Sequence, residues 1–193
     1  MTKAAPLPTL EELEIDIRFE GFGDVFLDLK SGGRRFELDG SYCWDSVHDL
    51  ICAAINIESG AWRPQIVQFE LEPGQFQMTL KPEYHHPTST RYLRLTVDEL
   101  RSSPGFETAS EPRELRFDAT LMVDSFPRAV YRAVAPYAKQ PDELYEIKWD
   151  LPFPEKAYRA LEAAIKTDRR PPIQRTYSES HVVLRADPNE IKK

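Results

Sequence analysis

Seven runs of alternating apolar and polar residues constrain what this chain can fold into. In the first run, LEIDIRFE at residues 13–20, every second side chain is apolar. A period of two places those apolar side chains on one face of a β-strand. Turn sequences such as SGG at 31–33 and Pro73-Gly74 separate neighbouring runs and favour hairpins. The pattern predicts antiparallel strands at residues 13–20, 25–29, 34–40, 67–72, 76–80, 91–97 and 114–124.

One helix interrupts the strands, after the third run. Residues 46–59 carry apolar side chains at helical spacing, with Asp45 as the N-cap and Gly60 as the C-terminal stop. The pattern becomes helical again at about residue 125, and we expect three helices between there and residue 166. Pro136 should kink or end the first of these three helices.

These elements predict an α+β fold, with C-terminal helices packed on one face of a mostly antiparallel sheet of six to seven strands. The helix after the third strand is an insertion in that sheet. A chain of 193 residues is long enough for one domain with a substantial core. We expect a single domain over residues 1–168, helical from about residue 125, followed by a proline-containing tail at 169–193.

The charge of the chain narrows the classes of function. The net charge is -7, and the tail has six Lys or Arg against three Asp or Glu, so residues 1–168 carry -10. An acidic chain is poorly suited to general binding of nucleic-acid phosphates or anionic lipid, and it suits a basic protein partner. No apolar run approaches the ~20 residues of a membrane span, and no signal-peptide pattern occurs. We therefore expect a cytoplasmic protein with both cysteines reduced.

No motif of a common enzyme class occurs in the sequence. The phosphate-binding patterns GxGxxG and GxxxxGK[ST] and the nucleophile elbow are all absent. Residues 41–60 do contain both cysteines, and His48 and Cys52 are i,i+4 neighbours there. Helix capping and periodicity account for almost every residue of that stretch, so we interpret it as a helix start. We predict no catalytic residues and no cofactor.

The candidate metal ligands are Glu83, His85 and His86, in the segment PEYHHP. Three ligands drawn from histidines and carboxylates are typical of catalytic zinc or iron sites. Adjacent histidines in a strand point to opposite faces, so His85 and His86 could share an ion only in a tight turn, which Pro87 permits. The alternative interpretation is an exposed polar loop at residues 81–90 that binds nothing.

Aromatic and basic side chains near that segment could also contact nucleic acid by stacking on bases and pairing with phosphates: Tyr84, Arg91, Tyr92 and Arg94. The overall negative charge argues against this function. Arginines on the solvated face of a strand are the simpler interpretation.

Several short motifs resemble a block of uncharacterised bacterial proteins. In that block a Trp-Asp pair opens a helix after a three-stranded start, as SYCWD and DLICAA do here. Glu72-Pro73-Gly74 follows, and Trp149 and Phe153-Pro154 come near the end, so the resemblance covers about residues 13–166. Small α+β proteins of this look resemble immunity proteins, which neutralise the toxins of polymorphic toxin systems. The resemblance carries no catalytic residues, and the tail after Lys166 departs from it.

Two functions of different classes follow from these observations. The first is a non-catalytic, protein-binding module of immunity-protein type, whose partner is another protein and, on charge, a basic one. The alternative is a small metal-dependent or ligand-binding enzyme that uses the His85–His86 loop. The C-terminal helices and tail could also mediate self-association, and the sequence leaves the oligomeric state open.

Overall fold

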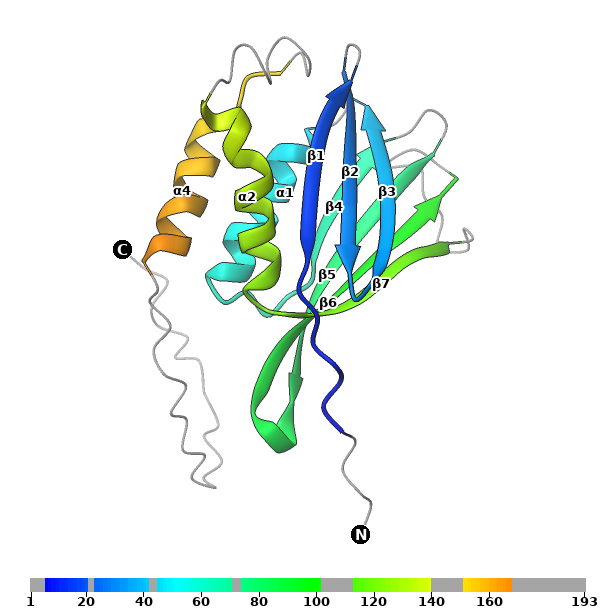
Figure 1. The fold of residues 1–193 in the computed structure, drawn as a ribbon, viewed down its shortest axis with the longest axis vertical. Coiled ribbons are helices and arrows are strands. Elements are labelled where there is room, and N and C mark those ends of the chain that lie inside the picture. The colour runs from blue at the N-terminus through cyan, green and yellow to red at the C-terminus, as the bar shows by residue number, and fades with distance from the viewer. Residues whose placement is uncertain are drawn as a thin grey trace, which may run out of the picture.

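The computed structural model describes residues 6–20, 23–41, 45–70, 74–101, 113–139 and 151–167. Within these ranges the chain forms two antiparallel sheets and three helices, which confirms the predicted α+β class (Figure 1). The strands are β1 (Glu14–Glu20), β2 (Asp24–Ser31), β3 (Arg34–Ser41), β4 (Gln65–Glu70), β5 (Gln75–His85), β6 (Thr90–Leu100) and β7 (Glu114–Met122). The helices are α1 (Ser46–Glu58), α2 (Ser125–Lys139) and α4 (Glu155–Lys166). The second of the three C-terminal helices, which the segment DELYEIKW predicts at residues 142–149 with Asp142 as its cap, lies outside the described residues, as does the tail at 169–193.

The strands pair in sequence order, as a chain of hairpins requires. One sheet has the order β1-β2-β3 and the other the order β4-β5-β6-β7. The predicted strands therefore form two sheets rather than one, and α1 connects them, as expected for a helix after the third strand. Asp45 caps α1 by accepting a hydrogen bond from the His48 amide at 3.1 Å, and Gly60 follows the helix with φ of 91°.

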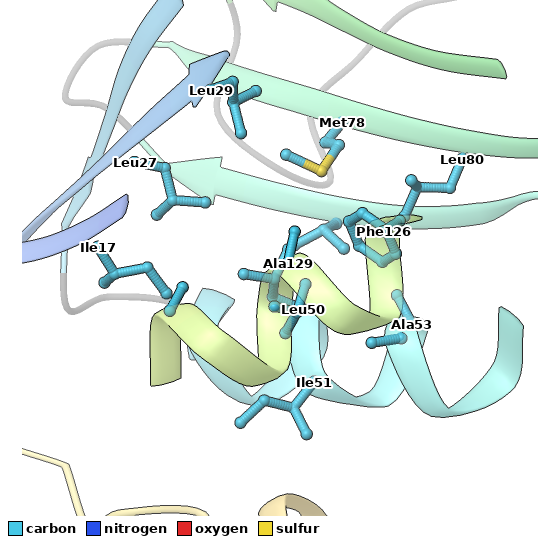
Figure 2. Packing of buried hydrophobic residues seen from close by; sticks show 14 of the residues in the cluster. Ile17, Leu27, Leu29, Leu50, Ile51, Ala53, Met78, Leu80, Phe126 and Ala129 are labelled. Atoms are coloured by element: carbon cyan, nitrogen blue, oxygen red, sulfur yellow. The ribbon is translucent and has the colours of Figure 1, made fainter. Parts of the chain in front are cut away.

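The apolar faces of both sheets meet in one core, which α1 and α2 complete (Figure 2). The inward side chains of the first sheet, such as Leu27 and Leu29, are fully buried. They face Met78 and Leu80 of β5, while Leu50 of α1 and Phe126 of α2 fill the same region. Burying this much apolar surface is the main favourable contribution to folding.

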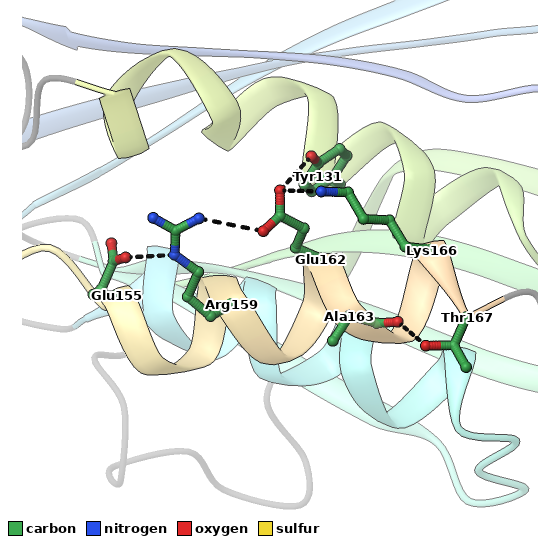
Figure 3. A network of polar contacts seen from close by, with 7 residues as sticks. All are labelled: Tyr131, Glu155, Arg159, Glu162, Ala163, Lys166 and Thr167. Carbon is green, nitrogen blue, oxygen red and sulfur yellow. Dashed lines mark hydrogen bonds and ion pairs between the residues drawn. The ribbon is translucent and has the colours of Figure 1, made fainter.

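Helix α4 packs on α1 and α2, on the side of the helices away from the sheets (Figure 1). Tyr158 is buried there and stacks on Tyr131 of α2, with ring centroids 5.6 Å apart. The Tyr131 hydroxyl also donates to Glu162 Oε1 at 3.1 Å, and Lys166 Nζ lies 2.9 Å from the same oxygen (Figure 3). An apolar stripe and a short polar network therefore hold α4 in place.

Side chains from other elements hydrogen-bond to carbonyl groups of three strands that end a sheet. The Tyr137 hydroxyl of α2 donates to the Ile17 carbonyl of β1 at 2.5 Å, and the Ser46 hydroxyl of α1 donates to the Gln68 carbonyl of β4 at 2.7 Å. The Arg34 guanidinium donates to the Asp118 carbonyl of β7. Covering strand edges in this way hinders unwanted pairing with other chains.

The residues before β1 join the two sheets. The Glu11 amide donates to the Thr120 carbonyl of β7 at 2.8 Å, and the Met122 amide donates to the Glu11 carbonyl at 3.3 Å. The Glu11 carboxylate accepts hydrogen bonds from Ser31 at 2.7 Å and from Arg34 at 2.6 Å. Glu11 thus connects the β2–β3 turn to the edge of the second sheet.

The prediction of a loop at residues 81–90 was wrong. Strands β5 and β6 pair out to His85 and Thr90, and only η1 (His86–Thr88) and Ser89 turn the chain. Because the β4–β5 pairing ends at Leu80, β5 has only one neighbouring strand at Pro82, and prolines are tolerated in strands at such open edges. Residues 81–91 of these two strands and their turn project beyond β4 and β7 as a hairpin, which we call the β5–β6 arm (Figure 1).

Pro136 does not end α2, which continues to Lys139. The proline lies in the last turn of the helix, where the carbonyl that loses its donor belongs to the exposed residue Arg132 and can be solvated. Among the described residues, no helix is both long enough and apolar enough to cross a membrane.

Candidate functional site: the acidic face of the first sheet

The outer face of the first sheet is strongly acidic. Strand alternation turns twelve side chains away from the core, and the register aligns them in four rows. The rows are Glu14–Lys30–Arg35, Asp16–Asp28–Glu37, Arg18–Phe26–Asp39 and Glu20–Asp24–Ser41. Seven carboxylates against three cations give these twelve positions a net charge of -4. We call this surface the acidic face.

Asp28 is the buried centre of the acidic face. Only 5% of it is exposed, because Arg35 and Lys30 cover it with nitrogens 2.8 and 3.4 Å from its two carboxylate oxygens. Burial raises the pKa of Asp28, but the hydrogen bonds from Arg35 and Lys30 outweigh it and the net pKa is lowered. Asp28 is therefore ionised at neutral pH, and its charge engages two of the three cations of the face.

Arg18 is the third cation. Its guanidinium lies 2.8 Å from Glu20 and 2.5 Å from Glu37, and its central carbon lies 5.6 Å from the centre of the Phe26 ring. This position suits a cation–π contact. Phe26 is half-buried, and it is the aromatic side chain at the middle of the acidic face.

Four carboxylates of the acidic face have no ion-pair partner among the described residues: Glu14, Asp16, Asp24 and Asp39. Asp16 is also aligned with Asp28, which in turn is aligned with Glu37, so one row holds three carboxylates. Like charges directly opposite each other destabilise a sheet. The packing of the fold does not require this arrangement, since the inward residues alone define which face is buried.

A hollow of about 330 Å³ lies beside the acidic face, at the β2–β3 turn. Its lining includes Glu12, Glu14, Lys30, Arg34 and Arg35. Lys30 and Arg35 already pair with Asp28, and Arg34 with Glu11. The hollow therefore offers no unpaired cation for an anionic substrate. Ser31 also lines it, but Ser31 is buried, and its hydroxyl is already engaged by Glu11 Oε2 at 2.7 Å and the Glu12 carbonyl at 3.0 Å.

The candidate metal ligands lie on the β5–β6 arm and are engaged separately. Glu83 pairs with Lys81 at 2.9 Å, and the hydrogen bonds from Lys81 and Tyr92 lower its pKa. His85 Nδ1 lies 2.8 Å from the Thr88 hydroxyl. The His86 ring packs edge-on against Tyr84, with centroids 4.9 Å apart. In the described parts of the chain, no three His, Cys, Asp or Glu side chains come together as a metal site. Metal binding by Glu83, His85 and His86 stays a prediction.

His48, Asp49 and Cys52 lie close together on α1. Cys52 Sγ is 3.6 Å from His48 Nε2, and His48 Nδ1 is 3.6 Å from Asp49 Oδ1. The order of these groups resembles that of a cysteine-nucleophile triad. However, burial, together with the charges of Asp49 and Asp45, raises the pKa of the Cys52 thiol. The thiol is protonated at neutral pH, which is the opposite of nucleophile activation.

The residues considered for nucleic-acid stacking do not form one surface. Tyr84 and Arg91 are register partners on the arm, whereas Tyr92 and Arg94 point to the other face of the strands. Arg94 pairs with both carboxylate oxygens of Asp118, at 3.2 and 3.0 Å. Its charge is therefore neutralised within the sheet.

Comparison with known proteins finds no match to this chain among family models, curated proteins or solved structures. The site therefore has to be judged on its own geometry.

Proposed function

We propose that this chain is a non-catalytic protein-binding module of immunity-protein type, and that its acidic face binds a basic partner protein. The observation that carries the proposal is a set of four carboxylates around Phe26 on one sheet face that have no ion-pair partner in the described part of the chain: Glu14, Asp16, Asp24 and Asp39. We also propose a cytoplasmic location, in keeping with two cysteines expected to be reduced.

Electrostatics gives such a face two roles. A field of one sign accelerates the encounter with an oppositely charged protein and selects against other partners. A regular sheet also holds its carboxylates without mobile loops, so little side-chain ordering remains to be done on binding. Phe26 supplies the aromatic contact that is common at the centre of protein interfaces.

The proposal is tested with the product of the gene directly upstream, purified with and without this chain. Asp16→Lys combined with Asp39→Lys reverses two unpaired charges, and we expect the Kd for that protein to rise at least about a hundredfold, as when interface charge pairs are lost. The matched control is Glu70→Lys with Asp98→Lys, on the other sheet, which changes the net charge equally and should alter the Kd little.

Two results would count against the proposal. The product of the upstream gene might not bind the wild-type chain at all, or Asp16→Lys with Asp39→Lys might weaken binding no more than the control. The metal-dependent alternative is tested separately, by elemental analysis of protein purified without a histidine tag and by the variant His85→Ala with His86→Ala.

A further inference from the structure

The most exposed large apolar side chain of the described residues is Trp62, at 75%. It lies in the link between α1 and β4, outside the acidic face. Exposed tryptophans are uncommon, and tryptophan, tyrosine and arginine are the side chains that most often anchor protein interfaces. Trp62 therefore requires an explanation beyond the packing of the monomer.

Hydrogen bonds on both sides of Trp62 hold the backbone of the link. The Ala61 amide donates to the Asn56 carbonyl at 2.9 Å, and the Ala61 carbonyl accepts from Arg91 Nη2 of the arm at 3.0 Å. On the other side, Gln65 Nε2 donates to the Arg63 carbonyl at 3.0 Å, and the Gln65 side chain also accepts from Asn56 Nδ2 at 2.8 Å. A backbone that is already held loses little further entropy on binding, so the link is pre-organised for contact.

Two arginines give this surface a positive charge. The Arg63 guanidinium lies 5.1 Å from the centre of the Trp62 ring, and Arg91 reaches the link from the arm. Within the described part of the chain, neither arginine forms an ion pair, and Glu58 at the end of α1 pairs with neither. We call Trp62, Arg63 and Arg91 the Trp62 surface.

The chain itself displays a complementary surface. Among the described residues, the acidic face carries four carboxylates without an ion pair around Phe26, whereas the Trp62 surface carries two arginines without one, of which Arg63 lies over the indole. Pairing between arms is a poorer route to association, since Pro82 has no N–H to donate along the open side of β5. We infer that the Trp62 surface docks on the acidic face of a second copy of this chain.

This contact is head-to-tail, because it joins two different surfaces. Each copy then keeps one free Trp62 surface or one free acidic face, and association continues beyond the dimer unless a ring closes. The contact depends on charge, so it weakens as salt screens the arginines from the carboxylates. It uses the same face as the proposed function, so a basic partner competes with it.

The test uses the full chain and two complementary variants in sedimentation velocity, from micromolar to millimolar concentration at low salt. Trp62→Ala with Arg63→Glu removes the docking surface, and Asp16→Lys with Asp39→Lys removes the receiving face. The wild type should sediment faster as its concentration rises, and each variant alone should associate at least about tenfold more weakly. An equimolar mixture of the two variants should form a dimer and stop there, because it contains one intact contact.

Three results would overturn the inference: a wild type that stays monomeric throughout, association that survives Trp62→Ala with Arg63→Glu, or a mixture that does not dimerise. Glu70→Lys with Asp98→Lys is the control for net charge and should behave as the wild type. The outcome is separable from the proposed function. The variant Trp62→Ala with Arg63→Glu keeps the acidic face, so a basic partner should still bind to it even where self-association is absent.

Discussion

Replacing Gly32 by alanine should loosen the join between the two sheets. Gly32 lies in the β2–β3 turn with φ of 56°, and a Cβ atom there would lie 2.4 Å from Glu11 Oε1 and 2.5 Å from the carboxyl carbon. That carboxylate accepts hydrogen bonds from Ser31 at 2.7 Å and from Arg34 at 2.6 Å. Alanine therefore has to displace the group that ties the turn to the residues bridging β7.

The cost of the substitution has two parts. Left-handed backbone costs an alanine about 1–2 kcal/mol. Displacing the Glu11 carboxylate weakens its hydrogen bonds from Ser31 and Arg34. Each contributes about 1 kcal/mol to stability, and the bond from Arg34 contributes no more than that, because solvent screens the half-exposed Arg34. We therefore expect Gly32→Ala to lower the free energy of unfolding by about 2–4 kcal/mol.

Gly33 provides the matched control. It lies in the same turn with φ of 77°, but a Cβ atom there would have nothing within 4 Å. Gly33→Ala should then cost only the backbone part, about 1–2 kcal/mol. Urea unfolding of both variants measures the difference, and repeating both in a Glu11→Ala background should abolish it. Equal costs in the wild-type background, or a difference that persists without Glu11, would refute this account of the turn.

Three further outcomes are expected. At low salt, Asp16→Asn should raise the free energy of unfolding by up to about 1 kcal/mol, seen as a higher Tm, since it removes a like-charge cross-strand pair with Asp28. Asp39→Asn should raise it less, because Asp39 is aligned with the uncharged Phe26. Burial raises the pKa of Tyr158 to about 12, so the unfolded chain loses this phenolic proton first, from about pH 10. The free energy of unfolding should therefore fall between about pH 10 and 12, and Tyr158→Phe should flatten that fall in a pH series of urea titrations. In a Cys43→Ser background, Cys52 should react with iodoacetamide at pH 7.5 more slowly than free cysteine, and Asp49→Asn should accelerate the reaction, because the Asp49 charge contributes to the raised pKa of the thiol.

Much of the fold follows from local sequence signals, because apolar residues recur at every second position in the strands and at helical spacing in the helices. The start and end of α1 could be predicted from Asp45 and Gly60, whose cap and positive φ the structure confirms. The division into two sheets could not be predicted. Each sheet is a series of hairpins. No local sequence signal shows whether the helix after β3 leads to another strand of the same sheet or to the first strand of a second sheet. The extension of β5 past Lys81 was hidden by Pro82, a proline that suits this place because β4 begins at Gln65, opposite Leu80, and leaves β5 unpaired on that side.

The acidic face was predictable in part. The two-residue turn Gly32-Gly33 fixes the β2–β3 register, which sets Lys30 opposite Arg35 and Asp28 opposite Glu37. The register of β1 against β2 depends on the connection around residues 21–22, and the sequence of that connection does not indicate one turn type. Only with that second register does Asp16 align with Asp28, and only then do scattered carboxylates become one surface.

The distribution of cations on the acidic face argues that its charge serves binding rather than folding. Arg35 and Lys30 both lie on Asp28, the carboxylate that burial makes most costly to leave unpaired. Asp16, in the same row, has no such partner among the described residues, although a threonine there would preserve the strand and remove the repulsion. Two of the three cations thus make the most buried charge tolerable and Arg18 pairs with Glu20 and Glu37, while four exposed carboxylates have no cation among the described residues. A surface arranged for stability alone would mix both signs along each row, so uncompensated charge on a rigid sheet favours a partner that supplies the missing cations.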